Sequence, residues 1–341
     1  MFHINNHNLS IIQVDGCATF WKRNKFLQVE NYCIEFNDIA RQEIARLGLD
    51  DNDARKYMNR LSRDNIAQIV VLEVLKSTTS TILTSNNNNN NSRNNQNICI
   101  TNTHLYSNVQ RADVKLWQAM NLIRELRQFI TQRDLPLLLC GDFNSEPESA
   151  VYEYIMSGMI QSERSELNYY QGGDLGNVRI LPDLHLLSHD LALTSVLHSS
   201  LGTEPLFTNY TQRFKGTLDY IFYSHSRIRV LAVSTLPDEH ELCAVAGEGL
   251  PSACYPSDHL LLCCDVALIP SGTGSILNTD MSHNPRINIL SMMRSHHNNS
   301  TSNLGSAPHI TNNLAMMRAH SSTSNLSTTP TPSTKSIAGR K

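Results

Sequence analysis

The chain has 341 residues, of which 40% are hydrophobic and 17% are charged, and its formal net charge is −3. This composition suits one large domain or two small ones, and the net charge argues against binding nucleic acid through a broad basic surface alone. Eight cysteines without a C-x-x-C pair are typical of a reduced, intracellular protein rather than of a disulfide framework. No secretory signal or membrane-spanning run is visible, so we expect neither secretion nor membrane insertion.

The first part of the chain is rich in short β-like segments. Residues 15–22 (DGCATFWK) and 26–36 (FLQVENYCIEF) are predicted strands, and residues 36–48 form a predicted helix that ends at Gly48. Two further strands, rich in Ile and Val, are expected over 65–76 and 97–105.

An asparagine-rich stretch separates these last two strands. An Asn homopolymer has no apolar side chains to bury, so we predict a solvated loop over residues 85–97. Such an expansion of a hairpin loop is tolerated because the entropy of loop closure grows slowly with length.

A long amphipathic helix is predicted over residues 112–132. Apolar residues recur there at spacings of three and four, which places them on one face: Leu116, Met120, Ile123, Leu126 and Ile130. The apolar strand LPLLLCGDF follows directly, and a helical segment is expected near 148–158. The remaining predicted strands are 216–224, 228–236 and 258–268.

The order of these elements predicts an α/β fold. Helices and strands are interspersed and neighbouring strands are mostly joined by loops, which favours mixed sheets covered by helices over a doubly wound parallel sheet. We place this domain at residues 14–270, after an atypical N-terminus at 1–13. From about Ser271 the chain is dominated by small and polar residues without any aromatic, so we predict a disordered tail over 271–341.

Several predicted strands end, begin or are interrupted at polar residues of the kind used in catalysis: His104, Asp142, Asn144, Asp219, Asp258 and His259. A carboxylate inside an apolar strand normally needs a partner. Each residue also has a structural explanation, as a turn cap, a hydrogen-bonded core histidine, an ion-pair partner or the start of a strand. Together, the carboxylates, imidazoles and amide at strand ends favour a site that cleaves phosphodiesters.

Such a site suits Mg²⁺, with Mn²⁺ as an alternative. Carboxylate oxygens are ligands that these ions prefer, whereas the Cys and His clusters of structural zinc sites are missing from the sequence. The metal would neutralise the phosphate, a carboxylate would orient or deprotonate water, and a His or Asn would stabilise the charge that develops on the phosphoryl oxygens.

The ordered segments NTHL, GDFNS, LDYIF and SDH resemble those of the exonuclease–endonuclease–phosphatase superfamily. Further segments narrow the resemblance to deadenylases related to carbon catabolite repressor protein 4, over about residues 14–268: DGCATFWK, IEFN, DNIAQIVVLEV, DVKLWQ, YTQRFKGTLDYIFYS and YPSDHLLL. The resemblance implies a four-layered α/β sandwich of the DNase I type, with two sheets flanked by helices and without the family's first strands.

The resemblance also implies catalytic roles. Asp142 would be the general acid or base and a ligand of one Mg²⁺, and Asp219 and His259 would complete the metal and phosphate environment. Asn144 and His104 would contact the scissile phosphate.

Four more residues are implied in substrate binding or in positioning. Phe214 would stack on an adenine base, and Asn209 would contact the nucleotide. Val109 stands where the family tends to have a Pro on the other side of the base. Asp258 would orient a histidine, for which His104 is the first choice.

The sequence departs from the family near its start. Family members carry a Gln-Glu-Val turn whose Glu is the principal Mg²⁺ ligand, on a strand that precedes anything seen here. Glu73 in VVLEVLK follows DGCATFWK and is a poor substitute, and Ser10 stands where a family Glu contacts substrate. We interpret the chain as a fragment of a longer enzyme. The alternatives are an inactive relative and a chain whose metal site is completed by a partner.

The function implied by the resemblance is Mg²⁺-dependent 3′→5′ shortening of the poly(A) tails of mRNA, with release of 5′-AMP. The alternatives are a phosphodiesterase of the same fold with another substrate, and a non-catalytic RNA-binding or scaffold protein. The expected partners are poly(A) RNA and a larger deadenylase complex. The expected compartment is the cytoplasm, with the nucleus as a second location.

Overall fold

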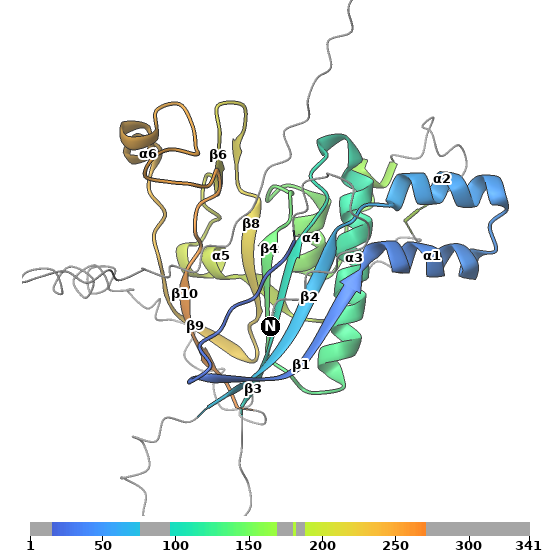
Figure 1. The fold of residues 1–341 in the computed structure, drawn as a ribbon, viewed down its shortest axis with the longest axis horizontal. Coiled ribbons are helices and arrows are strands. Elements are labelled where there is room, and N and C mark those ends of the chain that lie inside the picture. The colour runs from blue at the N-terminus through green and yellow to red at the C-terminus, as the bar shows by residue number, and fades with distance from the viewer. Residues whose placement is uncertain (1–15, 76–95, 169–179, 182–187, 271–341) are drawn as a thin grey trace, which may run out of the picture.

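The computed structural model describes residues 16–75, 96–168, 180–181 and 188–270. Their central element is a six-stranded mixed sheet in the order β1–β2–β3–β4–β8–β5 (Figure 1). Strands β3 and β4 are parallel, and all other neighbours in this sheet are antiparallel. The strands are β1 (Phe26–Glu35), β2 (Ile66–Val74), β3 (Asn97–His104), β4 (Leu137–Asp142), β5 (Leu193–Ser195) and β8 (Asp219–Ser224).

Helices α3 (Ala112–Thr131) and α4 (Ala150–Ser157) cover one face of this sheet, whereas α1 (Phe36–Leu47) and α2 (Asp51–Leu61) project beyond its β1 side (Figure 1). Residues of α1 and α2 join the same apolar cluster. Side chains alternate between the two faces of a strand, and β4 shows the consequence. Leu137 and Leu139 are buried in the cluster shared with the helices, whereas Leu138 packs against the cluster on the other face. The apolar run before GDFNS is therefore buried on both faces.

The second face of the sheet packs on a smaller layer. Helix α5 (Val196–Leu201) and the antiparallel pair β9 (Ile228–Val233) and β10 (Cys264–Leu268) contribute to its apolar cluster. A third cluster joins α6 (Glu239–Ala246) to the hairpin of β6 (Asn209–Tyr210) and β7 (Lys215–Gly216). The predicted α/β class is confirmed, and in the described part of the chain the second sheet consists of β9 and β10.

Residues 16–22 do not form the predicted strand. They have no regular structure and lie against the second face of the sheet, where Thr19 Oγ1 donates to Gln68 Oε1 at 2.8 Å and Asn102 Nδ2 donates to the carbonyl of Ala18 at 3.1 Å. The segment is held by hydrogen bonds to side chains of β2 and β3, in place of the backbone hydrogen bonds of a β-strand.

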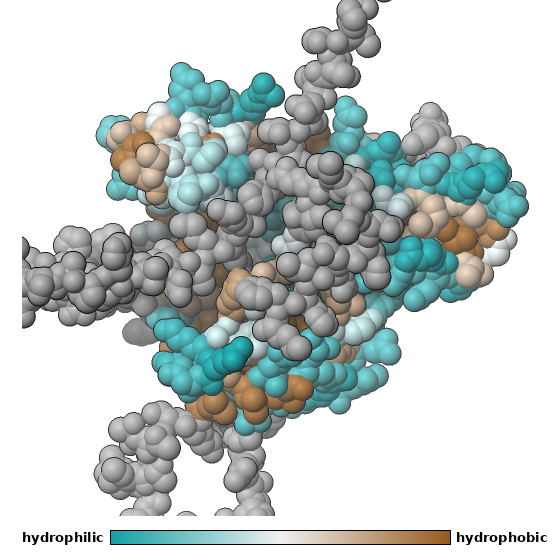
Figure 2. All heavy atoms as spheres, viewed as in Figure 1, coloured by the Kyte–Doolittle hydropathy of each residue, from teal (hydrophilic) through white to brown (hydrophobic). Residues whose placement is uncertain are grey.

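Helix α2 is an element that the sequence analysis did not predict. Its sequence is strongly polar, and Figure 2 shows hydrophilic surface over it, with apolar surface between α1 and α2. Asp50 caps its N-terminus by accepting from the backbone N–H groups of Asn52 and Asp53 at 2.9 and 2.8 Å. A buried ion pair between Arg60 and Asp113 then ties α2 to α3, with an N–O distance of 2.8 Å.

Two predicted strands have different limits in the structure. The strand expected over 258–268 begins only at Cys264, so Asp258 and His259 lie in an irregular segment before β10. Asp219 is the first residue of β8 and does not interrupt an apolar strand. This places Asp219 at the edge of the sheet, where a carboxylate can reach solvent or a ligand.

Parts of the chain with sequence predictions lie outside the described residues. They are the atypical N-terminus at 1–13, most of the Asn-rich loop at 85–97, and the tail at 271–341. In the ranges that the structure does describe, no helix is long and apolar enough to cross a lipid bilayer.

Candidate active site

The ends of β3 and β4 and the start of β8 meet at one edge of the main sheet. His104 is paired with Asp142 in the parallel register of β3 and β4, and Asp142 is paired with Asp219 in the antiparallel register of β4 and β8. Strand β4 thus places the carboxylate of Asp142 between the end of β3 and the start of β8.

Gly141 allows β4 to come this close to β3. Its φ angle is +146°, and a β-carbon at this position would lie 1.9 Å from the carbonyl oxygen of Thr103. No side chain fits there without moving the backbone of β3. The glycine of the GDFNS segment is therefore a requirement of the sheet, immediately before the candidate catalytic residue.

The turn after Asp142 is held by its own side chains. Asn144 has a φ angle of +47°, and its backbone N–H donates to Asp142 Oδ1 at 2.8 Å. The side-chain amide of Asn144 donates to the carbonyl of Leu105 at 2.9 Å, and the backbone carbonyl of Asn144 accepts from Lys115 Nζ at 2.6 Å. Carboxylate and amide are thus fixed before any substrate binds.

His259 reaches the same point from the segment before β10. Its backbone forms a β-bridge with Asn209, and its side chain is only 11% exposed. Nδ1 lies 2.7 Å from Asp219 Oδ2, which also accepts from Thr208 Oγ1 at 2.6 Å. Nε2 lies 3.9 Å from Asp142 Oδ2.

Asp142, Asp219 and His259 form the acidic cluster of this edge. One potential ligand atom from each residue lies within 4.8 Å of those from the other two. This is the set that the sequence analysis expected around a metal ion.

Burial and charge shift the protonation of the acidic cluster. Burial raises the pKa of Asp142 to about 7, with a further upward contribution from Asp219, while His259 opposes the shift. Burial lowers the pKa of His259, but its hydrogen bond to Asp219 and the nearby carboxylates outweigh this, and the pKa rises to about 9. Near neutral pH the cluster therefore holds an imidazolium beside a carboxyl group that readily exchanges its proton.

The donor set fits a divalent cation bound mainly through oxygen. Mg²⁺ typically takes one or two carboxylates from a protein and its other ligands from water and phosphate. Asp142 and Asp219 would supply those carboxylates. A cation between them would also relieve their mutual repulsion, which contributes to the raised pKa of Asp142.

Of the other candidate residues, His104 contacts the acidic cluster and Asp258 bonds Asn209. His104 Nε2 lies 3.4 Å from Asp142 Oδ2, so His104 joins the cluster. Asp258 was expected to orient His104, but it accepts a hydrogen bond from Asn209 Nδ2 at 3.4 Å. The carboxylate that forms a hydrogen bond with a histidine in this site is that of Asp219, and its partner is His259. The irregular course of residues 258–259 explains the difference, since it directs His259 toward the sheet edge.

The two apolar candidates for base binding lie on the surface. Phe214 is half-buried in the loop between β6 and β7, and Val109 is 77% exposed in the short helix η2 (Val109–Arg111). Glu73 pairs with Asn97 at the start of β3, opposite to the end that carries His104. The expectation that Glu73 cannot replace the family's metal ligand agrees with this position.

Lys115 and Thr208 were not predicted as site residues. Lys115 is 8% exposed on α3, and its ammonium group bonds the carbonyl of Asn144. Thr208 is fully buried and bonds Asp219. Lys115 immediately precedes the predicted apolar stripe of its helix, a weak sign that it is buried; nothing in the sequence distinguishes Thr208.

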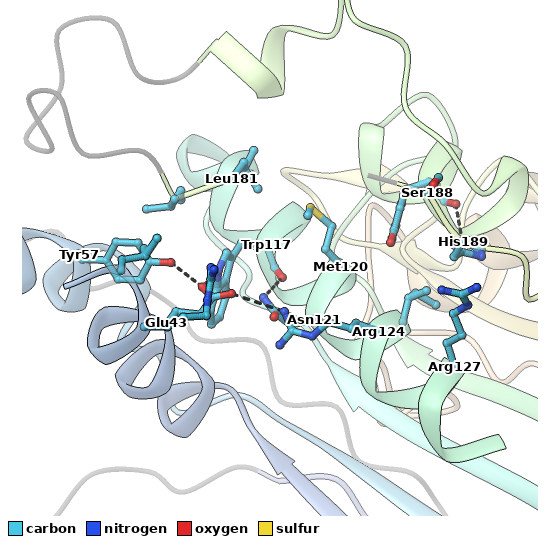
Figure 3. A pocket seen from close by; sticks show the side chains of 15 residues that line it. Glu43, Tyr57, Trp117, Met120, Asn121, Arg124, Arg127, Leu181, Ser188 and His189 are labelled. Atoms are coloured by element: carbon cyan, nitrogen blue, oxygen red, sulfur yellow. Dashed lines mark hydrogen bonds and ion pairs between the residues drawn. The ribbon is translucent and has the colours of Figure 1, made fainter. Parts of the chain in front are cut away.

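A cavity of about 540 Å³ lies elsewhere, beside α1, α2 and α3, and none of the predicted site residues lines it (Figure 3). Glu43 is central to its wall and accepts from Tyr57 Oη at 2.5 Å and from Trp117 Nε1 at 2.9 Å (Figure 3). Arg124 Nη1 lies 3.5 Å from the same carboxylate. These contacts identify the wall as a network that joins the helices.

The chain is similar to known proteins in sequence and in fold. Residues 13–259 match the endonuclease/exonuclease/phosphatase family. Carbon catabolite repressor protein 4 homolog 1 of Arabidopsis thaliana is 33% identical over 275 residues, which cover 75% of this chain and 43% of the relative. The CCR4-Not complex 3′-5′-exoribonuclease subunit Ccr4 of Mycosarcoma maydis is 28% identical over 320 residues, covering 87% of this chain and 41% of the relative.

A solved structure agrees in fold. ANGEL2, a 2′,3′-cyclic phosphatase in complex with adenosine-2′,3′-vanadate, superposes with a TM-score of 0.50 at 26% identity, covering 72% of this chain and 68% of that one. The chain spans about two-fifths of the length of the two relatives above, at 43% and 41%. The resemblance seen in the sequence is confirmed: the chain belongs to the endonuclease/exonuclease/phosphatase family and is similar to carbon catabolite repressor protein 4 homologs.

Proposed function

We propose that the chain hydrolyses the 3′-terminal phosphodiester of RNA, with poly(A) as the preferred substrate and Mg²⁺ as the metal. The observation that carries the proposal is the acidic cluster, in which Asp142, Asp219 and His259 converge within 4.8 Å at one sheet edge. The similarity to a 3′-5′-exoribonuclease subunit supports the direction of hydrolysis and RNA as the substrate.

Asp142 is placed for both proton transfers of this hydrolysis, and in the absence of a cation its pKa is raised to about 7. It accepts a proton from the attacking water, and the bond between phosphorus and the 3′ oxygen of the preceding nucleotide breaks. The proton then passes from Asp142 to that 3′ oxygen, and 5′-AMP leaves. Mg²⁺ held by Asp142 and Asp219 would supply charge neutralisation of the scissile phosphate.

The neighbours of Asp142 supply the remaining stabilisation. Asn144 Nδ2 and His104 Nε2 each lie 3.4 Å from Asp142 Oδ2. Both can donate to phosphoryl oxygens as negative charge develops. The imidazolium of His259, with its pKa near 9, adds a positive charge at the same place.

Adenine preference rests on the hairpin beside the acidic cluster. Phe214 provides an aromatic surface for a base, and stacking of this kind is common in the recognition of single-stranded RNA. We assign Asn209 and Val109 to the same nucleotide. Membership of a larger deadenylase complex, in the cytoplasm and secondarily in the nucleus, completes the proposal.

Tail shortening tests the substrate assignment. The full chain is incubated with Mg²⁺ and 5′-labelled RNAs that share a body and end in a run of either adenosines or uridines. We expect stepwise shortening of the adenosine tail with release of 5′-AMP, and much slower loss of uridines. Equal rates on both tails would reject the poly(A) preference.

A second candidate substrate is a terminal 2′,3′-cyclic phosphate. The similarity to ANGEL2, which is described as a 2′,3′-cyclic phosphatase, favours it. The same RNA body carrying a 2′,3′-cyclic phosphate separates the two functions, since a cyclic phosphatase would remove the phosphate and leave the length of the RNA unchanged.

A further inference from the structure

The carboxylate of Glu146 lies beside Phe214, the residue proposed to stack on the base. Gly216 separates the two side chains. A β-carbon on Gly216 would lie 2.7 Å from Phe214 Cζ and 2.8 Å from Glu146 Oε1. The tip of the aromatic ring and the carboxylate oxygen therefore border the same small space above Gly216.

The backbone that carries Glu146 is fixed on several sides. Three successive carbonyl groups, those of residues 144–146, accept hydrogen bonds: from Lys115 Nζ at 2.6 Å, Tyr220 Oη at 2.8 Å and the backbone N–H of Ser149 at 2.9 Å. Glu146 therefore extends from a rigid segment that begins at Asp142. A fixed backbone reduces the entropy that this segment loses when a ligand binds.

Phe214 is positioned independently from the other side. Its backbone N–H donates to Thr211 Oγ1 at 3.0 Å, and its carbonyl accepts from the Thr211 backbone N–H at 2.8 Å. The hairpin is closed by the pairing of Asn209 with Gly216. Two loops far apart in sequence thus bring an aromatic ring and a carboxylate to one place.

The Glu146 side chain is exposed and makes no hydrogen bond or ion pair in the described ranges, and its charge acts on the buried ammonium group of Lys115. The backbone of the segment is closely bonded, and the Glu146 carboxylate is left to meet a ligand beside Phe214. A free carboxylate at the rim of an RNA site repels phosphate, so a role in binding the RNA backbone is excluded.

We propose that Glu146 accepts a hydrogen bond from the exocyclic amino group of the base stacked on Phe214, and so selects adenine over uracil. This inference rests on the proposed function and names a specificity residue for it. An ionised carboxylate can only accept, and adenine offers an N6 amino donor. Uracil has a carbonyl at the corresponding place, whose lone pairs would face the carboxylate.

Binding of short RNAs tests this without requiring hydrolysis. The full chain is titrated in EDTA against 5′-fluorescein hexamers of adenosine, of uridine, and of purine riboside, which is adenosine without its amino group. We expect the adenosine hexamer to bind about 10-fold more tightly than the purine riboside hexamer, as for a hydrogen bond to a charged group. Glu146→Ala should reduce this ratio to about 1 by removing that bond.

Glu148→Ala is the matched control, since it removes a second exposed carboxylate from the same loop. It changes the net charge equally and should leave the ratio of affinities as in the wild type. Thermal unfolding of the variants shows that each is folded. Gly216→Ala should also abolish the ratio, because its methyl group displaces Phe214 or Glu146.

The inference is overturned if the wild type binds the adenosine and purine riboside hexamers equally. It is also overturned if Glu146→Ala keeps the ratio, or if no hexamer binds. The same proteins are then assayed for tail shortening with Mg²⁺. Selective binding without cleavage would reject the proposed hydrolysis and retain the role of Glu146. Cleavage without selective binding would reject the role of Glu146 alone.

Discussion

The carboxylate of Asp219 accepts a hydrogen bond from Nδ1 of His259 at 2.7 Å, and this contact makes the stability of the protein depend on pH. The pKa of His259 is raised from 6.5 to about 9. The folded state then binds more protons than the unfolded state between these values. The contribution of His259 to stability is therefore full below pH 6.5 and is lost as the pH rises to 9, by about 3 kcal/mol.

Urea unfolding in EDTA at several pH values measures this loss. Asp219→Asn should flatten the profile between pH 6.5 and 9, because the imidazole loses the partner that holds its proton. A wild-type profile without a slope in this range, or an unchanged slope in the variant, would show that the pair does not set the pKa of His259.

Asp142→Asn should stabilise the protein without metal. Burial raises the pKa of Asp142 to about 7, so at pH 8 the folded state carries a carboxylate in an unfavourable place. The neutral amide keeps the shape and the oxygen that accepts from the N–H of Asn144. The shift of the Asp142 pKa from 3.8 to about 7 corresponds to about 4 kcal/mol, so we expect a gain of up to about 4 kcal/mol in EDTA, measured by urea unfolding at pH 8. A loss of stability would mean that the carboxylate is favourably bound even without a cation.

Gly141→Ala should prevent stable folding. The new methyl group would lie 1.9 Å from the Thr103 carbonyl oxygen, and the φ angle of +146° is unfavourable for alanine. We expect a loss of at least about 3 kcal/mol. Gly202→Ala is the control, because Gly202 also has a positive φ angle, +84°, but open space around it. It should cost only about 1 kcal/mol. Equal losses would show that β3 and β4 can separate at this point.

Glu43→Ala should destabilise the contact between α1, α2 and α3. It leaves Tyr57 Oη and Trp117 Nε1 without the carboxylate that accepts from both. Buried donors without a partner are expensive, and we expect a loss of about 2–3 kcal/mol in chemical unfolding. Glu30→Ala removes an exposed pair with Arg133 and should cost less than about 1 kcal/mol. Similar losses in both would contradict the role given to Glu43.

Sequence patterns located the elements that have strong local signals. The spacing of apolar residues over 112–132 predicted α3, and runs rich in Ile, Val or Leu predicted β2, β3 and β4. The motifs at His104, Asp142 and Asp219 were singled out because polar residues stand at predicted strand ends, and the structure brings these three residues together in register.

The features that could not be predicted depend on contacts distant in sequence. Helix α2 is polar and is held by the Arg60–Asp113 pair, whose members are 53 residues apart. Residues 258–259 look like the start of an apolar strand, yet they bond to β6 and to Asp219. The pairing of His259 with Asp219 in place of an Asp258–His104 pair follows from that path, which no local pattern encodes.

The most direct test of the central claim is hydrolysis of a 5′-labelled RNA that ends in adenosines, by the full chain, with Mg²⁺, with EDTA, and by the Asp142→Asn variant. If the acidic cluster is a metal-dependent phosphodiesterase centre, the wild type shortens the RNA only with Mg²⁺, and the variant is slower by at least about 100-fold. Shortening that persists in EDTA, or an Asp142→Asn variant as active as the wild type, would place the chemistry elsewhere. A folded wild-type chain that leaves the RNA intact with Mg²⁺ would contradict the claim altogether.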